Sequence, residues 1–365
     1  MGFDTGAVAF RLFYLPCPAD SSLLDKFAAH AAPPITDLKT DPITGWVTGQ
    51  HLLDREITED KCLFGPYLYT QLMKAEKKIP ESLLRAYIKI EEEVEKKARG
   101  ATFLPRKVRS EIKERLVAHF LPQMPPTLTG IPSVTDLRTE MIVSGALSDK
   151  QVDAFFPAYR EIIGEIPILL TPDTAAMKRK RINPVDLDPI LFTPDETVEL
   201  PHESTLGMDF LTWLWFYWET GTGVFKHNDY EHGLMLEGPL TFFRDGEGAH
   251  EALLRNGSPL NSQEAGIALL RGKKLKKVKL TLTRGDWIVT ANVDSDFAFR
   301  AVKLPKTEND DASGIFQERM AFLEMFWTTF LALYDRFLDM RTNASDWRAT
   351  HAAMGEWIAR RAEKK

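Results

Sequence analysis

Seven basic side chains lie within fourteen consecutive positions of this sequence, in the segment RGKKLKKVKLTLTR at residues 271–284. No acidic residue interrupts them, although the whole chain of 365 residues has a formal net charge of −6. Subtracting these seven charges leaves −13 on the other 351 residues. Such a segment either faces a negatively charged partner or is neutralised inside the protein. The basic residues are Arg271, Lys273, Lys274, Lys276, Lys277, Lys279 and Arg284.

Residues 277–283 alternate between apolar side chains, at 278, 280 and 282, and lysine or threonine. A period of two is typical of a β-strand with one buried face. Successive lysines on the other face stand about 7 Å apart, which suits a phosphate backbone better than a compact pocket. A solvated strand explains the same pattern, and so does an edge strand that lysines protect against aggregation.

A second run of bases falls in residues 173–205, a segment that is rich in proline and has no sustained periodicity. The run consists of Lys178, Arg179, Lys180 and Arg181. Four consecutive bases in a predicted loop could contact phosphate, although a solvated loop explains them as well. We retain these four residues as additional candidate contacts.

One cluster combines histidines with acids. His227 and His232 enclose Asp229 and Glu231 in the sequence KHNDYEH, and imidazole and carboxylate ligands suit several divalent ions. The spacing is not that of the helical HExxH motif. A polar turn explains the cluster equally well, so we assign no metal site.

Asp294 and Asp296 form a carboxylate pair of the kind used in metal-assisted phosphodiester cleavage. They fall at a predicted hairpin turn, where aspartate is favoured for its own turn chemistry. No P-loop, GxGxxG or GxSxG motif stands in a suitable context. The sequence therefore predicts a protein that is not an enzyme, with no catalytic residue and no cofactor. A metal-dependent nuclease that uses these aspartates or the histidine cluster is the alternative.

The elements that must position these residues indicate an α+β protein with mixed antiparallel sheets, a protruding helical hairpin and a C-terminal helical segment. Proline and glycine delimit the hairpin at 80–121, with one helix from Pro80 to Gly100 and a second that begins at Pro105. The segment DFLTWLWFYWET is apolar on nearly all sides, so its tryptophans are expected in the core. Predicted strands span 7–15, 61–73, 138–146, 233–243, 275–283, 286–293 and 297–303; other predicted helices span 20–31, 148–163, 314–341 and 345–361.

These elements divide the chain into four parts. Residues 1–172 are predicted as an N-terminal α+β domain that contains the hairpin, and 173–205 as a linker or insertion. Residues 206–305 are predicted as a C-terminal α+β domain with the basic strand, followed by C-terminal helices at 306–365.

Composition narrows the class of protein. Cys17 and Cys62 are the only cysteines, which argues against a zinc module and a disulfide-rich secreted scaffold. The N-terminus does not resemble a signal peptide, and no apolar stretch reaches the roughly 20 residues that a membrane span needs. We therefore expect a cytoplasmic protein without a membrane partner.

Four groups of residues share their order and spacing with a known family. They are Gly45-Trp46-Val47; Lys77-Lys78-Ile79-Pro80; Arg109-Ser110-Glu111-Ile112-Lys113 leading to Phe120-Leu121-Pro122; and Ser262-Gln263-Glu264, Gly272-Lys273 and Lys277-Val278. Together they resemble the bacterial recombination-associated protein RdgC family, over nearly the whole chain except about 173–205. The FLTWLW segment at 210–215 and the GIFQERM helix are similar to a longer branch of that family.

The resemblance implies a homodimer that closes into a ring, binds DNA with little sequence preference through a positively lined hole, and restrains RecA-type recombinase filaments. It implies a nucleoid-associated protein whose partners are DNA, single or double stranded, a second copy of the chain, and a recombinase filament. If each subunit made about three phosphate contacts, the logarithm of the affinity would fall against the logarithm of salt with a slope near −5. A protein-interaction scaffold, whose lysines meet an acidic partner or the chain's own acids at 91–95, is a further alternative.

The resemblance also assigns residues. Lys273 and Lys277 fall on basic positions like those of the family, and the other basic residues of 271–284 are added to the predicted DNA-binding set. A basic and an aromatic residue commonly follow the Leu-Pro of the hairpin, at a tip used for dimer contact. Here Met124 and Pro125 stand close to that place and are the predicted dimer contacts. Asn256-Gly257-Ser258 replaces a basic pair upstream of the Ser-Gln-Glu helix, so that contribution to DNA contact is expected to be absent.

Overall fold

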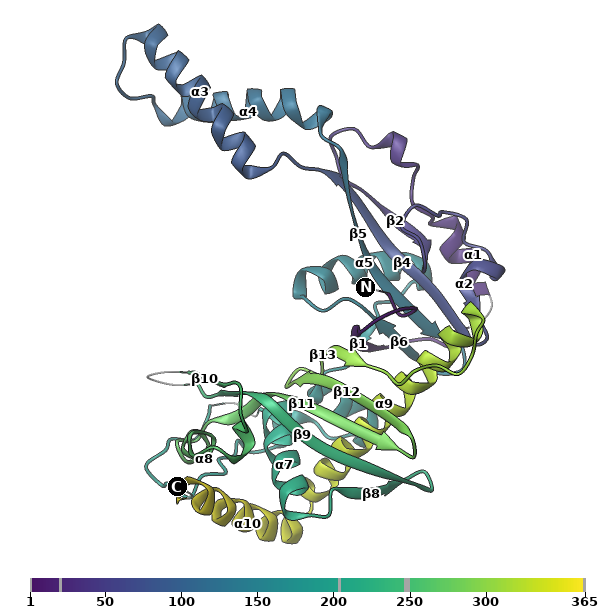
Figure 1. The fold of residues 1–365 in the computed structure, drawn as a ribbon, viewed down its shortest axis with the longest axis vertical. Coiled ribbons are helices and arrows are strands. Elements are labelled where there is room, and N and C mark those ends of the chain that lie inside the picture. Colours follow the sequence, from purple (N-terminus) through teal and green to yellow (C-terminus); the bar gives the residue numbers. More distant parts are fainter. Residues whose placement is uncertain (1, 20–21, 203–204, 246–249, 364–365) are drawn as a thin grey trace.

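The computed structural model describes residues 2–19, 22–202, 205–245 and 250–363, and in this part of the chain thirteen strands form one antiparallel sheet (Figure 1). The main order is β10-β9-β11-β12-β13-β1-β6-β5-β4-β2, with β8, β7 and β3 beside β9, β1 and β4. The strands are β1 Val8–Tyr14, β2 Ile43–Thr48, β3 Leu63–Phe64, β4 Tyr67–Lys77, β5 Pro126–Asp136, β6 Met141–Ser144, β7 Ile168–Leu169, β8 Val224–His227, β9 Tyr230–Phe243, β10 Glu251–Leu254, β11 Lys274–Arg284, β12 Trp287–Asp294 and β13 Phe299–Lys303.

Helices pack around this sheet, so the predicted α+β class is confirmed. The two long C-terminal helices and the helices around residues 20–31 and 148–163 occur close to their predicted positions. The helices are α1 Ser22–Ala29, α2 Glu59–Cys62, α3 Glu81–Arg99, α4 Arg106–Phe120, α5 Asp149–Ile163, α6 Pro172–Ala175, α7 Leu206–Thr220, α8 Gln263–Leu270, α9 Ala312–Thr342 and α10 Ala344–Glu363.

Strand β1 joins the N-terminal and C-terminal strands into one sheet. On one side it pairs with β13, where Val8 lies opposite Val302, and on the other side it pairs with β6. Residues 7–15 were predicted as a strand, but their position between two sequence-distant hairpins depends on contacts that the local pattern does not contain.

Helices α7 and α9 cover one face of the sheet and form the largest hydrophobic cluster with it. Trp213 and Trp215 of α7 are buried there, which confirms the prediction for these two, whereas Trp218 is only partly buried against the same cluster. Phe330 of α9 packs edge-to-face on Phe299 of β13, at a ring separation of 5.1 Å. Helix α9 continues along the sheet to the N-terminal strands, where Phe316 stacks on Tyr69. The burial of these large aromatic side chains stabilises both halves of the sheet together.

Helices α1 and α5 cover the opposite face of the N-terminal strands. Phe27 of α1 and Tyr159 of α5 meet Trp46 of β2 in a second hydrophobic cluster. The buried Tyr159 hydroxyl is satisfied by Thr135 at 2.5 Å. Helix α5 begins with a capping box between Ser148 and Gln151, which satisfies backbone donors of its first turn.

Helices α3 and α4 project from the end of β4 and β5 and pack against each other (Figure 1). Pro80 and Pro105 precede the two helices, and Gly100 ends α3 in a left-handed conformation with φ of 59°. These positions agree with the helix boundaries that proline and glycine predicted. Arg115 and Glu91 form an ion pair of 2.6 Å between the helices.

The segment 173–205, which was predicted as a linker or an insertion, packs against the C-terminal helices within its described residues, as an insertion does. Ile190 and Phe192 are buried in the main hydrophobic cluster. His351 of α10 is hydrogen bonded through Nε2 to the carbonyl of Leu191 at 2.5 Å. Apolar residues placed irregularly among prolines reach the core here without helical or strand periodicity.

Among the described residues, no helix is both long enough and apolar enough to cross a lipid bilayer.

Candidate nucleic-acid interface

One face of β9, β11, β12 and β13 is not covered by a hydrophobic cluster formed by the described residues. Val278, Leu280 and Leu282 of β11 point to the opposite face, into the cluster with α7 and α9. The residues between them therefore lie on the uncovered face, as the predicted alternation requires. We call this uncovered surface the open sheet face. It consists of the exposed or half-buried residues 235, 237, 277, 279, 288, 290, 292, 300 and 303, with the buried side chains of Thr281 and Asp294 among them.

Two cations of the open sheet face are neutralised by acids on neighbouring strands. Lys279 Nζ lies 2.6 Å from Glu237 of β9, the residue directly opposite it in the sheet. Arg300 of β13 lies 2.5 Å from Asp294 of β12. Both pairs are partly exposed, so they contribute little to stability, but each lowers the local positive charge.

Two other cations of this face form no ion pair within the described part of the chain. Lys277 is exposed on β11, and Lys303 is exposed on β13. Lys277 belongs to the predicted set, whereas Lys303 does not. Together they give the open sheet face an excess of positive charge over its two acids, because Lys279 and Arg300 balance Glu237 and Asp294.

Lys274 does not contribute to this surface, and its assignment as a DNA contact is corrected. Only 5% of Lys274 is exposed. Its ammonium group lies 2.5 Å from the buried Asp209 of α7 and donates to Thr205 Oγ1 at 2.9 Å. The pairing of β11 with β9 shifts register on either side of Lys277, so the alternation of faces does not extend back to Lys274.

The remaining predicted residues of 271–284 lie in three different environments. Lys276 packs over the ring of Phe243 at 4.3 Å. Arg284 lies between the rings of Tyr230 and Trp287, at the turn between β11 and β12. Arg271 is exposed and Lys273 half-buried, in the connection between α8 and β11. The seven bases are thus not one cationic face, and β11 is not an edge strand, because β9 and β12 flank it.

The four bases at 178–181 also lie in different environments. Arg179 and Lys180 form ion pairs with Asp335 and Asp339 of α9, at 2.5 and 2.7 Å. These pairs fix the π-helical turn Ala176–Lys180 on α9, so the prediction of a loop is wrong. Lys178 and Arg181 are exposed and stay candidates for a phosphate contact.

The acids at 91–95 do not neutralise the basic strand. Glu91 and Glu92 pair with Arg115 and Arg109 of α4, and Glu93 and Glu95 pair with bases one turn later in α3. The alternative in which this run meets the lysines of 271–284 within one chain is therefore wrong. The carboxylates that do meet the basic strand are Asp209 and Glu237.

The predicted dimer contacts Met124 and Pro125 lie at the base of the helix pair, not at its tip. They follow the short helical turn at 121–123 and lead directly into β5. Lys77, at the end of β4, donates to the carbonyl of Pro122 at 2.7 Å, which fixes this position beside the sheet. The tip is the loop 100–105, where 79% of Phe103 is exposed.

Neither the histidine cluster nor the aspartate pair belongs to a group of three suitable metal ligands among the described residues. His232 is buried, with Nδ1 3.3 Å from the hydroxyl of Thr329 on α9. Asp294 accepts from the backbone N–H groups of Asp296 and Ala298 and pairs with Arg300. It thus has the structural role in the turn that its type and position indicate.

The half-buried His227 and the buried His232 make stability depend on pH. Burial lowers the pKa of His227 and of His232 below the ordinary value of about 6.5, and nearby cations lower both further. The unfolded chain then binds protons more readily than the folded chain as the pH falls below about 6.5. The free energy of unfolding should therefore decrease, with a slope of at most about 1.4 kcal/mol per pH unit for each histidine.

Urea unfolding at pH 7.5, 6.5 and 5.5 measures this effect. The variant His227→Gln/His232→Gln keeps all carboxylates, so the difference between its pH profile and that of the original chain isolates the histidines. Equal slopes in the two proteins between pH 7 and 5.5 would contradict the assignment.

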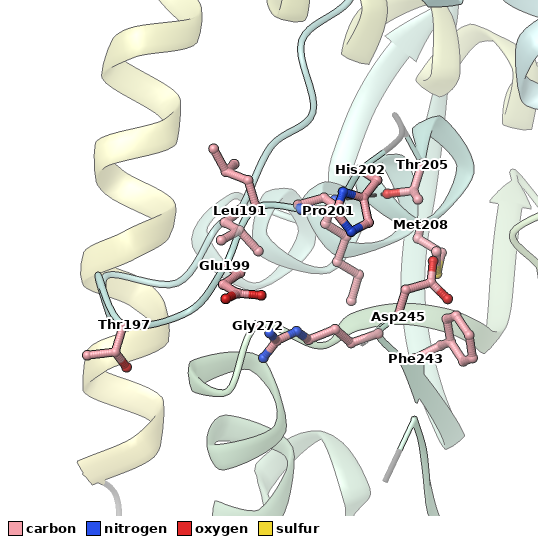
Figure 2. A pocket seen from close by; sticks show the side chains of 13 residues that line it. Leu191, Thr197, Glu199, Pro201, His202, Thr205, Met208, Phe243, Asp245 and Gly272 are labelled. Carbon is pink, nitrogen blue, oxygen red and sulfur yellow. Dashed lines mark hydrogen bonds between the residues drawn. The ribbon is translucent and has the colours of Figure 1, made fainter. Parts of the chain in front are cut away.

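A cavity of about 510 Å³ is lined in part by the buried Lys274. Figure 2 shows His202, Glu199 and Asp245 around it, together with the apolar side chains of Leu191 and Phe243. Its lining contains cations and carboxylates together. Of the two threonines in the described lining, Thr197 donates to Asp195, and Thr205 accepts from Lys274 and donates to Asp209.

In comparisons with known proteins, the sequence matches no protein-family model and no curated protein. The resemblance to the RdgC family stays a prediction.

Arg300 and Lys303 were not among the predicted site residues. Each stands alone between apolar neighbours in the sequence FRAVKL, so no local run of charge indicates them. The pairing of β13 with β12 brings Lys303 opposite Thr290 and Arg300 opposite Asn292. Only the register of the sheet connects them to Lys277 and Lys279.

Proposed function

We propose that the protein binds DNA without sequence specificity through the open sheet face, and that it does so as a binding protein and not as an enzyme. The observation that supports this most is an uncovered sheet face with Lys277 and Lys303 exposed and unpaired among the described residues. Lysines on flat strands contact phosphates without reading base edges, which gives affinity without sequence preference.

The geometry of this face suits an extended polyanion. Lys277 and Lys303 stand on strands β11 and β13, which are separated by β12. Lys277 lies opposite Asp294 of β12 and Lys303 opposite Thr290, so their backbones are roughly 10 Å apart across the strands and roughly 13 Å apart along them, or roughly 16 Å in all. Exposed Asn292 lies between them and can donate to a phosphate oxygen. The paired cations Lys279 and Arg300 add to the surface when a phosphate competes with Glu237 and Asp294.

A titration of fluorescent duplex across a range of salt concentrations tests the proposal. In Lys277→Glu/Lys303→Glu, the logarithm of the affinity should fall less steeply with the logarithm of salt, by about 1.8 for each copy of the chain that contacts the DNA. Binding should also be weaker at every salt concentration. In contrast, Glu237→Gln should strengthen binding, because it releases Lys279.

A matched control changes the same charge elsewhere. Lys107 and Lys113 are exposed on α4 and form no ion pair within the described residues. Lys107→Glu/Lys113→Glu alters the net charge equally and should leave the salt slope unchanged. If both double variants weaken binding alike, net charge and not the open sheet face is responsible. Cleavage of the duplex in the presence of magnesium would instead support the nuclease alternative.

We extend the proposal to encirclement of DNA by a dimer. A dimer that closes around DNA and restrains a recombinase filament is what the family resemblance implies, and the projecting helices α3 and α4 with exposed Phe103 supply a second region that could meet another copy. Retention of the protein on circular but not on linear DNA after a salt wash would support encirclement. Equal loss from both would contradict it.

A further inference from the structure

The outer edge of β10 has a sequence that is complementary to itself, and we propose that it pairs antiparallel with β10 of a second copy of this chain. Strand β10 is the last strand of the sheet on the side of β9. No other described strand pairs with its outer edge. An unpaired edge presents a row of backbone donors and acceptors that a further strand can satisfy.

The register of β10 and β9 shows which backbone groups point outward. Arg244 N–H donates to the carbonyl of His250 at 3.1 Å, in line with the pairing of the two strands. In an antiparallel ladder, hydrogen-bonded and non-hydrogen-bonded pairs alternate. The N–H and C=O groups of Ala252 and Leu254 therefore point to β9, as those of His250 do. The groups of the residues between them point away from the sheet.

Those intervening residues also form a distinct face. Glu251 and Leu253 are exposed, with 42% of Leu253 accessible, and exposed Arg255 follows directly after the strand. In contrast, Ala252 and Leu254 pack against the main hydrophobic cluster. Neither Glu251 nor Arg255 forms an ion pair with another described residue. The sequence thus presents an acid, an exposed apolar residue and a base along one edge.

A two-fold axis through Leu253 matches this edge to its own copy. Leu253 then lies opposite the partner's Leu253, and the outward backbone groups of both residues form a hydrogen-bonded pair. Glu251 lies opposite the partner's Arg255, and Arg255 opposite the partner's Glu251. A shift by two residues in either direction breaks both opposite-charge pairs, so charge selects this register.

The pairing would extend the open sheet face across two copies. Leu253 lies opposite Thr241 of β9, and Thr241 lies opposite Lys277 of β11, so the three share one row across the sheet. In the joined sheet the two Lys277 residues stand on strands five spacings apart, or roughly 24 Å. The inference concerns the chain without DNA and does not require the proposed function. If that function is correct, the pairing joins the DNA-binding faces of two copies.

Reciprocal charge exchange tests the pairing without DNA. The weight-average mass is measured by sedimentation equilibrium for the original chain, Glu251→Arg, Arg255→Glu and the double variant. The original chain should dimerise. Each single variant places like charges opposite each other twice and should weaken dimerisation at least about tenfold. The double variant restores opposite charges and should regain most of the affinity.

The residues exchanged are exposed, so the variants should fold, and unchanged circular dichroism and thermal unfolding check this. Dimers of unchanged affinity in both single variants, a monomeric original chain, or a double variant no better than the singles would each overturn the proposal.

A second test fixes the register. In a hydrogen-bonded antiparallel pair the Cα atoms are about 5.5 Å apart, which a disulfide can span. Leu253→Cys should therefore give a covalent dimer on mild oxidation, seen on a non-reducing gel. Ile288→Cys, at a more exposed position but on β12, should not. No cross-link from Leu253→Cys, or equal cross-linking from both, would contradict the two-fold axis at Leu253.

These outcomes are distinguishable from failure of the proposed function. Glu251→Arg leaves Lys277 and Lys303 in place, so a monomeric variant should still bind DNA, with about half the salt slope of the dimer. A chain that dimerises through β10 but does not bind DNA at low salt would retain this inference and reject the proposed function.

Discussion

Replacing Lys274 by methionine is expected to lower the free energy of unfolding by about 3–5 kcal/mol, because it leaves Asp209 buried without a counter-ion. Only 2% of Asp209 is exposed, and its carboxylate is held by Lys274 and by the hydroxyl of Thr205. Methionine is unbranched and only one heavy atom shorter than lysine, so little of the loss arises from a cavity. Urea unfolding at pH 7 measures the change.

The effect should grow with pH. Burial raises the pKa of Asp209, against the opposing effect of the Lys274 ammonium. Without Lys274 the folded chain binds a proton at Asp209 more tightly than the unfolded chain does. A group with a raised pKa stabilises the fold at low pH and loses that contribution as the pH rises through its folded pKa. The variant should therefore be less destabilised at pH 5 than at pH 8.

Two further variants test whether the loss of stability comes from leaving Asp209 buried without a counter-ion or simply from removing a lysine. Lys274→Met/Asp209→Leu removes both charges and should recover most of the stability, since a buried ion pair and apolar residues of similar volume are often equivalent. Lys277→Met, three residues along the strand but exposed, should change stability by less than about 0.5 kcal/mol. A cost at Lys277→Met as large as that at Lys274→Met would contradict the assigned environments.

This contrast between Lys274 and Lys277 shows what the local pattern can and cannot reveal. The alternation of residues 277–283 correctly identified a strand and its apolar face, because a period of two is a local property. Whether a lysine is solvated or buried depends on which residue the fold places beside it. Asp209 comes from a helix 65 positions earlier, and no feature near residue 274 indicates it.

The elements themselves were largely predictable. Proline and glycine delimited α3 and α4, and apolar periodicity indicated α5, α9 and the strands β9 and β11 to β13. Strand β5 was missed, since its sequence PTLTGIPSVTD contains two prolines and a glycine. Its pairing along the full length of β4 supports the extended conformation that local propensity disfavours.

The site was predictable only in part. Lys277 and Lys279 were identified by charge and alternation, and both lie on the open sheet face. Lys303 and Arg300 reach that face from β13, which joins it through the pairing with β12. Such pairing is specified by long-range packing on α9 and not by a motif. A sequence reading therefore finds charges that are concentrated along the chain and misses those that the sheet brings together.

Replacing Gly207 by alanine is expected to destabilise the fold by about 3 kcal/mol, although alanine is the better helix former. Gly207 lies in the first turn of α7, where a Cβ atom would stand 1.8 Å from the carbonyl oxygen of Ser295 and 2.8 Å from Pro172. The first contact is with backbone, so no side-chain rotation relieves it. The start of α7 would have to move away from the turn between β12 and β13, at the upper end of the cost of overpacking.

Gly355 in α10 provides the matched control, because it is also a helical glycine. A Cβ atom there meets only the carbonyl oxygen of Phe192, at 3.8 Å, which is an ordinary van der Waals contact. Gly355→Ala should therefore stabilise the chain by about 0.5–1 kcal/mol through helix propensity. Thermal unfolding of both variants gives the two changes, which should have opposite signs. A stabilised Gly207→Ala would show that the first turn of α7, which also carries the buried Asp209, does not pack this closely on the turn between β12 and β13.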